Sequence, residues 1–299
     1  GSFGFNFINL LAYGTITRNV AFRINYSPGL ASSGFYTSPS ASSGDLNFAN
    51  IRLSNLERFL GVTDKNSYLL NLTVGKYELD LPFSEFRSPT VNTPMAIYTY
   101  TSGTPYTTAL SGPLNNVRSY ANPNNFSLQN PQPGIELFGI KPTGGNGYLR
   151  YSLNAISNSN LNNGTGGVGG GKGLNFYGHV TQSFGGYGIV TGHRIGVFGM
   201  YGEAPTTANS VCPTCTAVGG GGQPFSRIGV DVSTTFDGQW NLFGAILHAY
   251  DSKELFASKG IANAQNAAWN GGFVELDWYP TQLPYFGTPG WLFIYRYDL

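Results

Sequence analysis

Charged residues are the scarcest class in this chain. Only 10% of the 299 residues are Asp, Glu, Lys or Arg, and the 16 basic residues nearly cancel the 15 acidic ones. A typical soluble domain has about 25% charged residues. The small net charge and the lack of a Lys/Arg cluster argue against a nucleic-acid-binding protein. With so few charges, either the surface of the protein does not face water or it is covered by another molecule.

Long hydrophobic runs are also missing. A transmembrane helix needs about 18 or more apolar residues in a row, but polar or glycine residues interrupt every apolar stretch here. Residues 1–5 show no basic segment followed by an apolar one, so we expect any secretory signal to have been removed. The 21 Phe, 19 Tyr and 4 Trp nevertheless provide more buriable surface than a disordered chain carries. We therefore expect a folded protein without membrane-spanning helices.

The chain has only two cysteines, Cys212 and Cys215, in one C-x-x-C pair. No second pair completes a zinc site, and Thr216 stands where a haem attachment motif has histidine. The glycine run at 219–222 indicates a loop rather than the start of a thioredoxin-like helix. We therefore expect no metal site and a loop disulfide formed in an oxidising compartment, with a redox role as the alternative.

The strongest positive pattern is an alternation of apolar and polar residues with a period of two, which indicates strands with two different faces. Over residues 227–236, five mostly apolar residues alternate with Arg, Gly, Asp, Ser and Thr. The pattern predicts a first tight turn near Gly14 and no amphipathic helix. It predicts twelve strands, near 3–12, 16–26, 46–56, 66–79, 133–142, 147–157, 174–185, 189–203, 225–236, 239–251, 268–280 and 288–299.

The predicted connections alternate between long and short. After the first turn, long ones (27–45, 80–132, 158–173, 204–224 and 252–267) alternate with short ones (57–65, 143–146, 186–188, 237–238 and 281–287). Transmembrane β-barrels show this alternation, with short periplasmic turns and long extracellular loops. Twelve strands would put both chain ends on the long-loop side, opposite to the usual arrangement. Either one more strand lies beyond each end, which gives about fourteen, or one of the twelve strands is assigned wrongly.

A soluble β-sandwich or propeller would explain the strands and turns equally well. Its water-facing surface, however, would carry Lys and Glu that oppose edge pairing. In a barrel that spans lipid, the apolar face meets acyl chains, the polar face meets a watery lumen, and closure leaves no unpaired edge. We therefore expect an all-β fold, an antiparallel transmembrane β-barrel of about 12–14 strands, in one domain over residues 1–299.

Tyrosines near the predicted strand ends suit the interfacial girdles of such barrels. The β-propensity of tyrosine explains any single one of them equally well. The candidates are Tyr26, Tyr77, Tyr148, Tyr187, Tyr201, Tyr250, Tyr279 and Tyr297.

The most unusual stretch is the long inserted loop 80–132, which proline interrupts too often for continuous strands. Long loops without secondary structure in compact folds are usually functional. This loop either folds inward and narrows the lumen or forms an exposed cap or partner surface. In the first case, the candidate constriction residues are Glu85, Arg87, Tyr98, Tyr100, Tyr106 and Arg118.

Strand parity assigns a set of charged side chains to the polar face, and therefore to the lumen. Their signs nearly balance, so we do not expect the strong ion selectivity that a ring of one sign gives. The alternative is that they form ion pairs in the wall, such as Arg227 with Asp231 or Arg296 with Asp277. The lumen-lining candidates are Arg23, Arg52, Arg150, Arg227, Asp231, Glu275, Asp277, Arg296 and Asp298.

Catalysis has little support in the sequence. His179, His193 and His248 lie in no recognisable hydrolase or metalloprotease motif, and no haem attachment motif is present. The glycine-rich stretch 164–173 lacks the spacing of a phosphate-binding loop, because Lys172 is followed by Gly173. We expect a protein that is not an enzyme and has no cofactor.

Two parts of the chain, Thr73–Ser88 and Gly272–Pro280 followed by Tyr295–Asp298, resemble porin-like outer-membrane barrels of Gram-negative bacteria. Among these, the chain is most similar to barrels associated with multihaem cytochromes. The resemblance implies an outer-membrane location, contact with lipid, and either a pore or a sheath around a cytochrome.

Barrel diameter grows with strand number, and a lumen of twelve to fourteen strands is narrow for a multihaem protein. We therefore expect a passive, weakly selective channel for small solutes. The alternative is a structural scaffold that holds a periplasmic or extracellular cytochrome partner. Association of several copies of the chain stays open.

Overall fold

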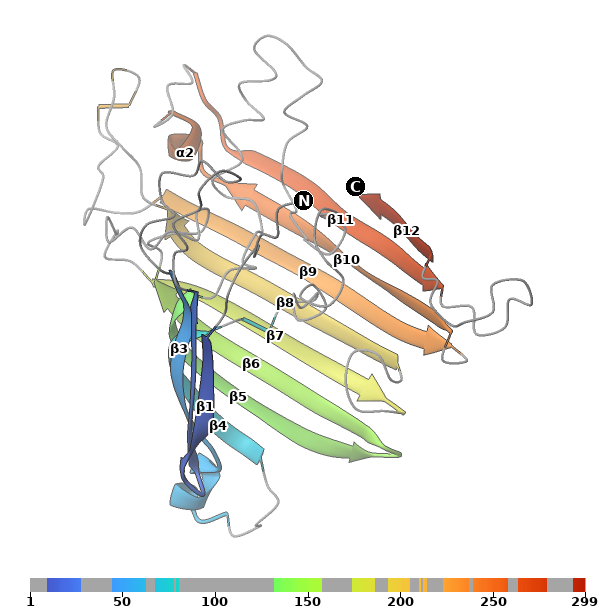
Figure 1. The fold of residues 1–299 in the computed structure, drawn as a ribbon. Coiled ribbons are helices and arrows are strands. Elements are labelled where there is room, and N and C mark those ends of the chain that lie inside the picture. The colour runs from blue at the N-terminus through green and yellow to red at the C-terminus, as the bar shows by residue number, and fades with distance from the viewer. Residues whose placement is uncertain are drawn as a thin grey trace, which may run out of the picture.

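The computed structural model contains one antiparallel sheet in which twelve strands follow each other in sequence order (Figure 1). This confirms the expected all-β, antiparallel class. Within the part of the chain that is described, β1 and β12 each have one neighbouring strand, so the sheet is open between them. The structure describes residues 10–27, 45–62, 68–77, 79–80, 132–157, 174–185, 193–204, 210, 212–213, 223–236, 239–257, 263–278 and 293–298.

Two short helices accompany the strands. The first, η1 (Leu56–Leu60), joins β3 to β4, and the second, α2 (Lys253–Ala257), follows β10. No helix in the described ranges is long and apolar enough to cross a membrane. The strands are β1 (Leu10–Thr17), β2 (Val20–Ser27), β3 (Asp45–Leu53), β4 (Tyr68–Tyr77), β5 (Gln132–Gly144), β6 (Gly147–Ser157), β7 (Leu174–Phe184), β8 (His193–Ala204), β9 (Gln223–Phe236), β10 (Trp240–Asp251), β11 (Ala267–Trp278) and β12 (Phe293–Asp298).

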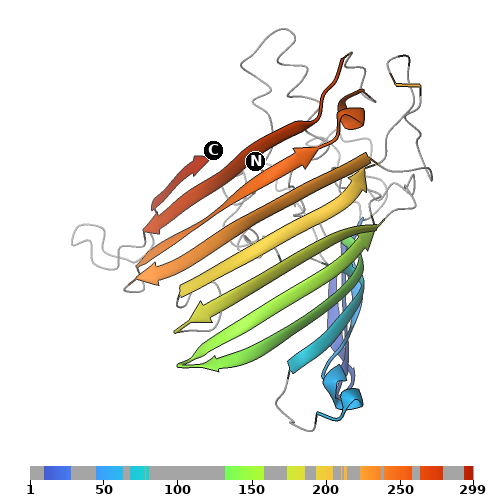
Figure 2. The same cartoon turned by 180° about the vertical axis from the view of Figure 1, so that it is seen from behind.

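The sheet is strongly curved. Figures 1 and 2 show β1 to β4 standing at an angle to the broad surface that the later strands form. Side chains from each of the first six strands line one common cavity. The curvature therefore places the same face of these six strands on the inside.

The two faces of the sheet differ in the way the alternation predicts. Along β9, Arg227, Asp231 and Ser233 are buried, whereas their neighbours Ile228 and Val230 are 66% and 45% exposed. Strand β7 repeats this pattern, with burial alternating at every residue. We call the face that carries the buried charges the polar face, and the opposite one the apolar face. In a water-soluble protein the buried face is normally the apolar one.

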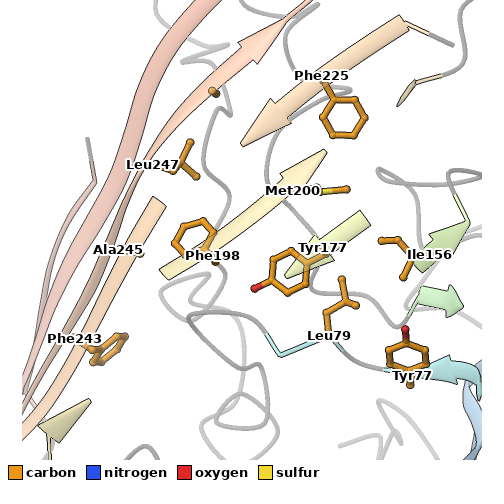
Figure 3. Close-up of a cluster of buried hydrophobic side chains, with 11 residues drawn as sticks. Tyr77, Leu79, Ile156, Tyr177, Phe198, Met200, Phe225, Phe243, Ala245 and Leu247 are labelled. Atoms are coloured by element: carbon orange, nitrogen blue, oxygen red, sulfur yellow. The ribbon is translucent and has the colours of Figure 1, made fainter. Parts of the chain in front are cut away.

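The polar face also carries a cluster of buried apolar side chains, which Figure 3 shows in close-up. The cluster runs across β4 to β10, so this part of the polar face is packed rather than open. Its members are Tyr77, Leu79, Ile156, Tyr177, Phe198, Met200, Phe225, Phe243, Ala245, Leu247 and Ala249.

The predicted first turn near Gly14 is wrong. Strand β1 continues to Thr17, and the chain reverses at Arg18 and Asn19. Gly14 pairs with Phe22 of β2, and a Cβ atom on Gly14 would lie 3.2 Å from the Phe22 ring. The glycine therefore makes room for an aromatic ring rather than reversing the chain.

Helix η1 supports an irregularity in β4. The register between β4 and β5 shifts between Tyr68 and Asn71. The Glu57 carboxylate of η1 accepts a hydrogen bond of 3.0 Å from the Leu70 backbone N–H, and the Asn71 amide donates to the carbonyl oxygens of Tyr68 and Phe138. Side chains therefore satisfy backbone groups that a regular ladder would pair.

Candidate functional site

A cavity of about 830 Å³ lies on the polar face of β1 to β6. Small-molecule sites typically have volumes of about 300–1,000 Å³. Three arginines from three different strands line it, Arg23 of β2, Arg52 of β3 and Arg150 of β6. Two carboxylates, Asp80 and Glu136, also line the cavity.

Aromatic rings hold two of these guanidinium groups. The Cζ atom of Arg23 lies 4.1 Å from the centre of the Phe48 ring, and that of Arg52 lies 4.8 Å from the centre of the Phe138 ring. A cation–π contact of this kind restrains a guanidinium group and leaves N–H donors available for hydrogen bonds.

The two carboxylates are less accessible than the arginines. Glu136 is 5% exposed and accepts a hydrogen bond of 2.8 Å from the Ser152 hydroxyl. The Asp80 side chain is 10% exposed and pairs with Arg150 at 3.2 Å, whereas the Arg150 side chain is 38% exposed. Arg52 is exposed as well. The charge that the cavity offers to a solute is therefore mainly positive.

Asp80 also joins the cavity to a buried ion network on β7, β8 and β9. His179 lies between two carboxylates, with Nδ1 3.3 Å from Asp80 Oδ2 and Nε2 2.8 Å from Asp231 Oδ2. Arg194 completes the network through a contact of 3.3 Å with Asp231 Oδ1. His179, Arg194 and Asp231 are all buried. The network connects the chain just after β4 to strands that do not pair with β4.

The hydrogen-bond partners of His179 define where its protons lie. The Asp80 backbone carbonyl oxygen, 2.8 Å from Nδ1, can only accept, so Nδ1 donates to it. A carboxylate oxygen faces Nε2, and this second contact needs a further proton between Nε2 and Asp231. His179 therefore has a fixed orientation and a partner at each ring nitrogen.

A glycine makes room for the His179–Asp231 contact. Gly196 of β8 lies between the two residues, and a Cβ atom there would be 2.3 Å from Asp231 Oδ2 and 2.8 Å from His179 Nε2. No side chain other than hydrogen fits this position without displacing the hydrogen bond.

The structure places the predicted lumen-lining residues in different surroundings. Arg23, Arg52 and Arg150 line the cavity, as described above. Arg227 is buried beyond it and donates to the carbonyl oxygens of Ser226 and Tyr250, at 2.8 and 3.0 Å.

The expected pairing of Arg227 with Asp231 does not form. Four residues along one strand separate positions by about 13 Å, and Asp231 instead contacts His179 and Arg194.

The remaining predicted charges lie on β11 and β12. Glu275 is fully buried and stands opposite Arg296 in the register. Asp277, the expected partner of Arg296, accepts a hydrogen bond of 3.3 Å from the Asn241 amide, and its register partner on β12 is Ile294. The side chains of Arg296 and Asp298 lie outside the described part of the structure.

The constriction candidates Glu85, Arg87, Tyr98, Tyr100, Tyr106 and Arg118 lie outside the described residues, as does Cys215. Cys212 is buried and disulfide-bonded. Leu79 and Asp80, which directly follow β4, lie against the polar face, where Asp80 contacts Arg150 and His179.

Sequence reasoning missed four residues of the network and cavity: Asp80, Glu136, His179 and Arg194. Strand parity could have found three of them, because Glu136, His179 and Arg194 occupy polar-face positions of β5, β7 and β8. Asp80 follows its strand, where alternation gives no signal.

Aromatic side chains mark both ends of the apolar face. At the ends of β7 to β12 next to the short connections, Trp278 stacks on Trp240 at 5.1 Å and on Phe293 at 5.2 Å between ring centroids. Phe236 pairs with Trp240, His193 lies 5.7 Å from Phe236 between ring centroids, and Phe184 pairs with His193, so the row continues across β9, β8 and β7. At the other ends of these strands lie Phe176, Tyr201 and Tyr250, all exposed.

The girdle prediction for single tyrosines is therefore partly wrong. Tyr26, Tyr201, Tyr250 and Tyr297 are exposed, whereas Tyr77 and Tyr148 are buried and face the interior side of the sheet. Parity separates the two groups, because a strand-end position alone does not fix the face. Tyr187 and Tyr279 lie outside the described ranges.

Comparisons with protein families, with curated proteins and with solved structures find no match for this chain. In the described part of the structure, no group of three or more His, Cys, Asp or Glu side chains could hold a metal ion.

Proposed function

We propose that the chain forms the wall of an outer-membrane β-barrel that acts as a passive, weakly selective channel for small polar solutes. The observation that carries this proposal is the inverted polarity of the sheet. Arg227, Asp231 and His179 are buried on one face, while the other face exposes Ile228 and Val230 among many large apolar side chains. Lipid is the surrounding in which such an apolar face is stable.

The spacing of the aromatic rows supports a membrane-spanning orientation. Phe176 and Phe184 lie eight residues apart on β7, and Trp240 and Tyr250 lie ten apart on β10. These intervals correspond to about 26–33 Å along a strand. A strand tilt of about 35–45° reduces them to about 19–27 Å, a range that includes the apolar band of about 25 Å in outer-membrane barrels.

The proposed lipid surroundings also favour a sheet that closes into a barrel. Unpaired backbone groups are costly in hydrocarbon, so the edges of β1 and β12 need partners. The first and last of twelve meandering strands run in opposite directions. Antiparallel pairing can therefore close the sheet directly, or through two additional strands.

The solute path is best placed along the first six strands. The cavity there carries exposed Arg52 and half-exposed Arg150, whereas β7 to β10 present packed side chains such as Phe198 and Phe243 on the same face. A hydrated path needs polar walls and free volume, and the cavity region combines both.

A charge placed on the apolar face tests the membrane orientation. Val230 lies in the middle of β9 and is 45% exposed, whereas Leu174 is 55% exposed and begins β7. In a bilayer, Val230→Arg should cost about 2–4 kcal/mol and Leu174→Arg about 0–1 kcal/mol. On a water-facing surface both changes would stay within about 0.5 kcal/mol. Urea unfolding in phospholipid vesicles measures the difference, and equal small costs would contradict the proposal.

Planar-bilayer conductance of the purified chain tests the channel, alongside an absorbance scan for haem. Stable conductance steps without a haem band support diffusion through the barrel. Silence with a co-purifying haem band would replace the channel with a scaffold that holds a cytochrome. Silence without haem would indicate a blocked barrel and would also overturn the channel.

A further inference from the structure

We infer that the cavity beside β1 to β6 is a binding site for small organic carboxylates with an apolar body. The inference rests on the proposed function only in making this site part of the solute path. The cavity is large enough for such a molecule, with a volume of about 830 Å³.

The accessible charges of the cavity carry the first part of the inference. Asp80 is occupied by Arg150 and His179, and Glu136 is buried with a hydrogen bond from Ser152. Arg52 is exposed and lies over the Phe138 ring, and within the described part of the chain it makes no hydrogen bond or ion pair. A solute that enters the cavity therefore meets an available guanidinium group before it meets an available carboxylate.

The shape of the arginine side chain supports a carboxylate as the ligand. A planar guanidinium group matches a carboxylate through two parallel N–H···O hydrogen bonds, which a lysine ammonium group cannot provide. The Arg52 Cζ atom lies over the Phe138 ring, 4.8 Å from its centre. This contact restrains the guanidinium group beside the cavity, where its N–H donors can receive a planar anion.

The apolar side of the cavity supports a ligand with an apolar body. Leu11 and Tyr13 of β1 line it, and Tyr13 is 75% exposed. Both stand on the polar face by register, because Tyr13 pairs with Arg23 and Leu11 with Asn25. An exposed apolar wall facing arginines suits a molecule with a carboxylate at one end and a hydrocarbon group at the other.

Benzoate is a suitable probe, because it combines a carboxylate with an aromatic ring. Equilibrium dialysis of radiolabelled benzoate against the detergent-purified full chain should show saturable binding. Arg52→Gln should weaken it by at least about tenfold, since it removes a charge-assisted bidentate contact. Arg18→Gln makes the same change in the exposed β1–β2 turn, away from the cavity, and should leave binding unchanged. Equal binding by the parent chain and both variants would overturn the site.

Two further measurements sharpen the test. Arg52→Lys keeps the charge but loses the planar fork, so unchanged benzoate binding would overturn the bidentate geometry. Inorganic phosphate should compete poorly because it has no apolar body, and competition as strong as that of unlabelled benzoate would overturn the assignment to carboxylates. Circular dichroism confirms that each variant folds, and Arg23→Gln carries the same prediction if Arg52→Gln does not fold.

The binding assay separates this inference from the channel, because dialysis in detergent needs no conductance. Benzoate binding that depends on Arg52 in a protein that does not conduct would leave the site standing and overturn the channel. Conductance without benzoate binding would overturn the site and leave the channel standing.

Discussion

Replacing Gly196 by alanine tests the buried ion network most directly. The added Cβ atom would lie 2.3 Å from Asp231 Oδ2, 2.8 Å from His179 Nε2 and 2.8 Å from Thr181 Cγ2. Carbon and oxygen atoms that are not bonded to each other stay more than 3 Å apart, so at least one partner must move. The hydrogen bond of 2.8 Å between His179 and Asp231 is the contact that must break.

The magnitude follows from two contributions. Overpacking a well-packed position costs about 1–3 kcal/mol, and a buried hydrogen bond to a charged group contributes about 1.5–3 kcal/mol. Alanine also lowers the entropy of the unfolded chain relative to glycine, which offsets about 0.4–1 kcal/mol. The net expectation for Gly196→Ala is a loss of about 3 kcal/mol in the free energy of unfolding.

Gly199 provides a matched control on the same strand. A Cβ atom there would meet no atom closer than the Arg227 carbonyl oxygen, at 3.6 Å. Urea unfolding of both variants in phospholipid vesicles, followed by tryptophan fluorescence, gives the two free energies. Gly199→Ala should be neutral within about 0.5 kcal/mol. If Gly196→Ala is as stable as Gly199→Ala, the network does not have the geometry described here.

Two further changes test other parts of the sheet. Trp278→Ala removes two aromatic stacks at one end of the apolar face and should lower the free energy of unfolding in vesicles by more than about 1 kcal/mol, at about 0.5–1.5 kcal/mol per pair; an unchanged midpoint would contradict the role of the aromatic row. Glu57→Ala leaves the Leu70 backbone N–H without its carboxylate partner and should cost about 1–3 kcal/mol in the same titration. A cost within error of zero would show that the bulge in β4 does not depend on η1.

The alternation of residue types predicts most of the sheet. A period of two indicates that a segment is a strand, and it also indicates which side chains lie on the same face of that strand. All twelve predicted ranges overlap strands of the structure, and Ile228 and Val230 lie on the face that parity assigns. The position of the first turn is wrong, because a glycine within a strand, here Gly14, looks like a turn residue in the sequence. Its actual role, space for the Phe22 ring, depends on a neighbouring strand and has no signal within its own segment.

The sequence predicts several residues of the candidate site, but not which of them contact each other. Parity finds Arg52, Arg150 and Asp231 as polar-face residues, but which charges meet depends on strand order, register and curvature. Asp231 of β9 contacts His179 of β7 across β8, because Gly196 has no side chain to fill the space between them. This contact involves residues from three different strands. The alternation along any one strand therefore cannot predict it.

The sequential pairing of the strands has a consequence for how the sheet can vary. Because each strand pairs only with its neighbours along the chain, removing or duplicating one hairpin keeps all other pairings and changes only the width of the sheet. The region from Asp80 to Asp231 is different. There the contacts through His179 fasten non-adjacent segments to each other, so a hairpin cannot be gained or lost without breaking them. We expect variants with a changed number of strands to be tolerated near β11 and β12 and to fail between β5 and β9.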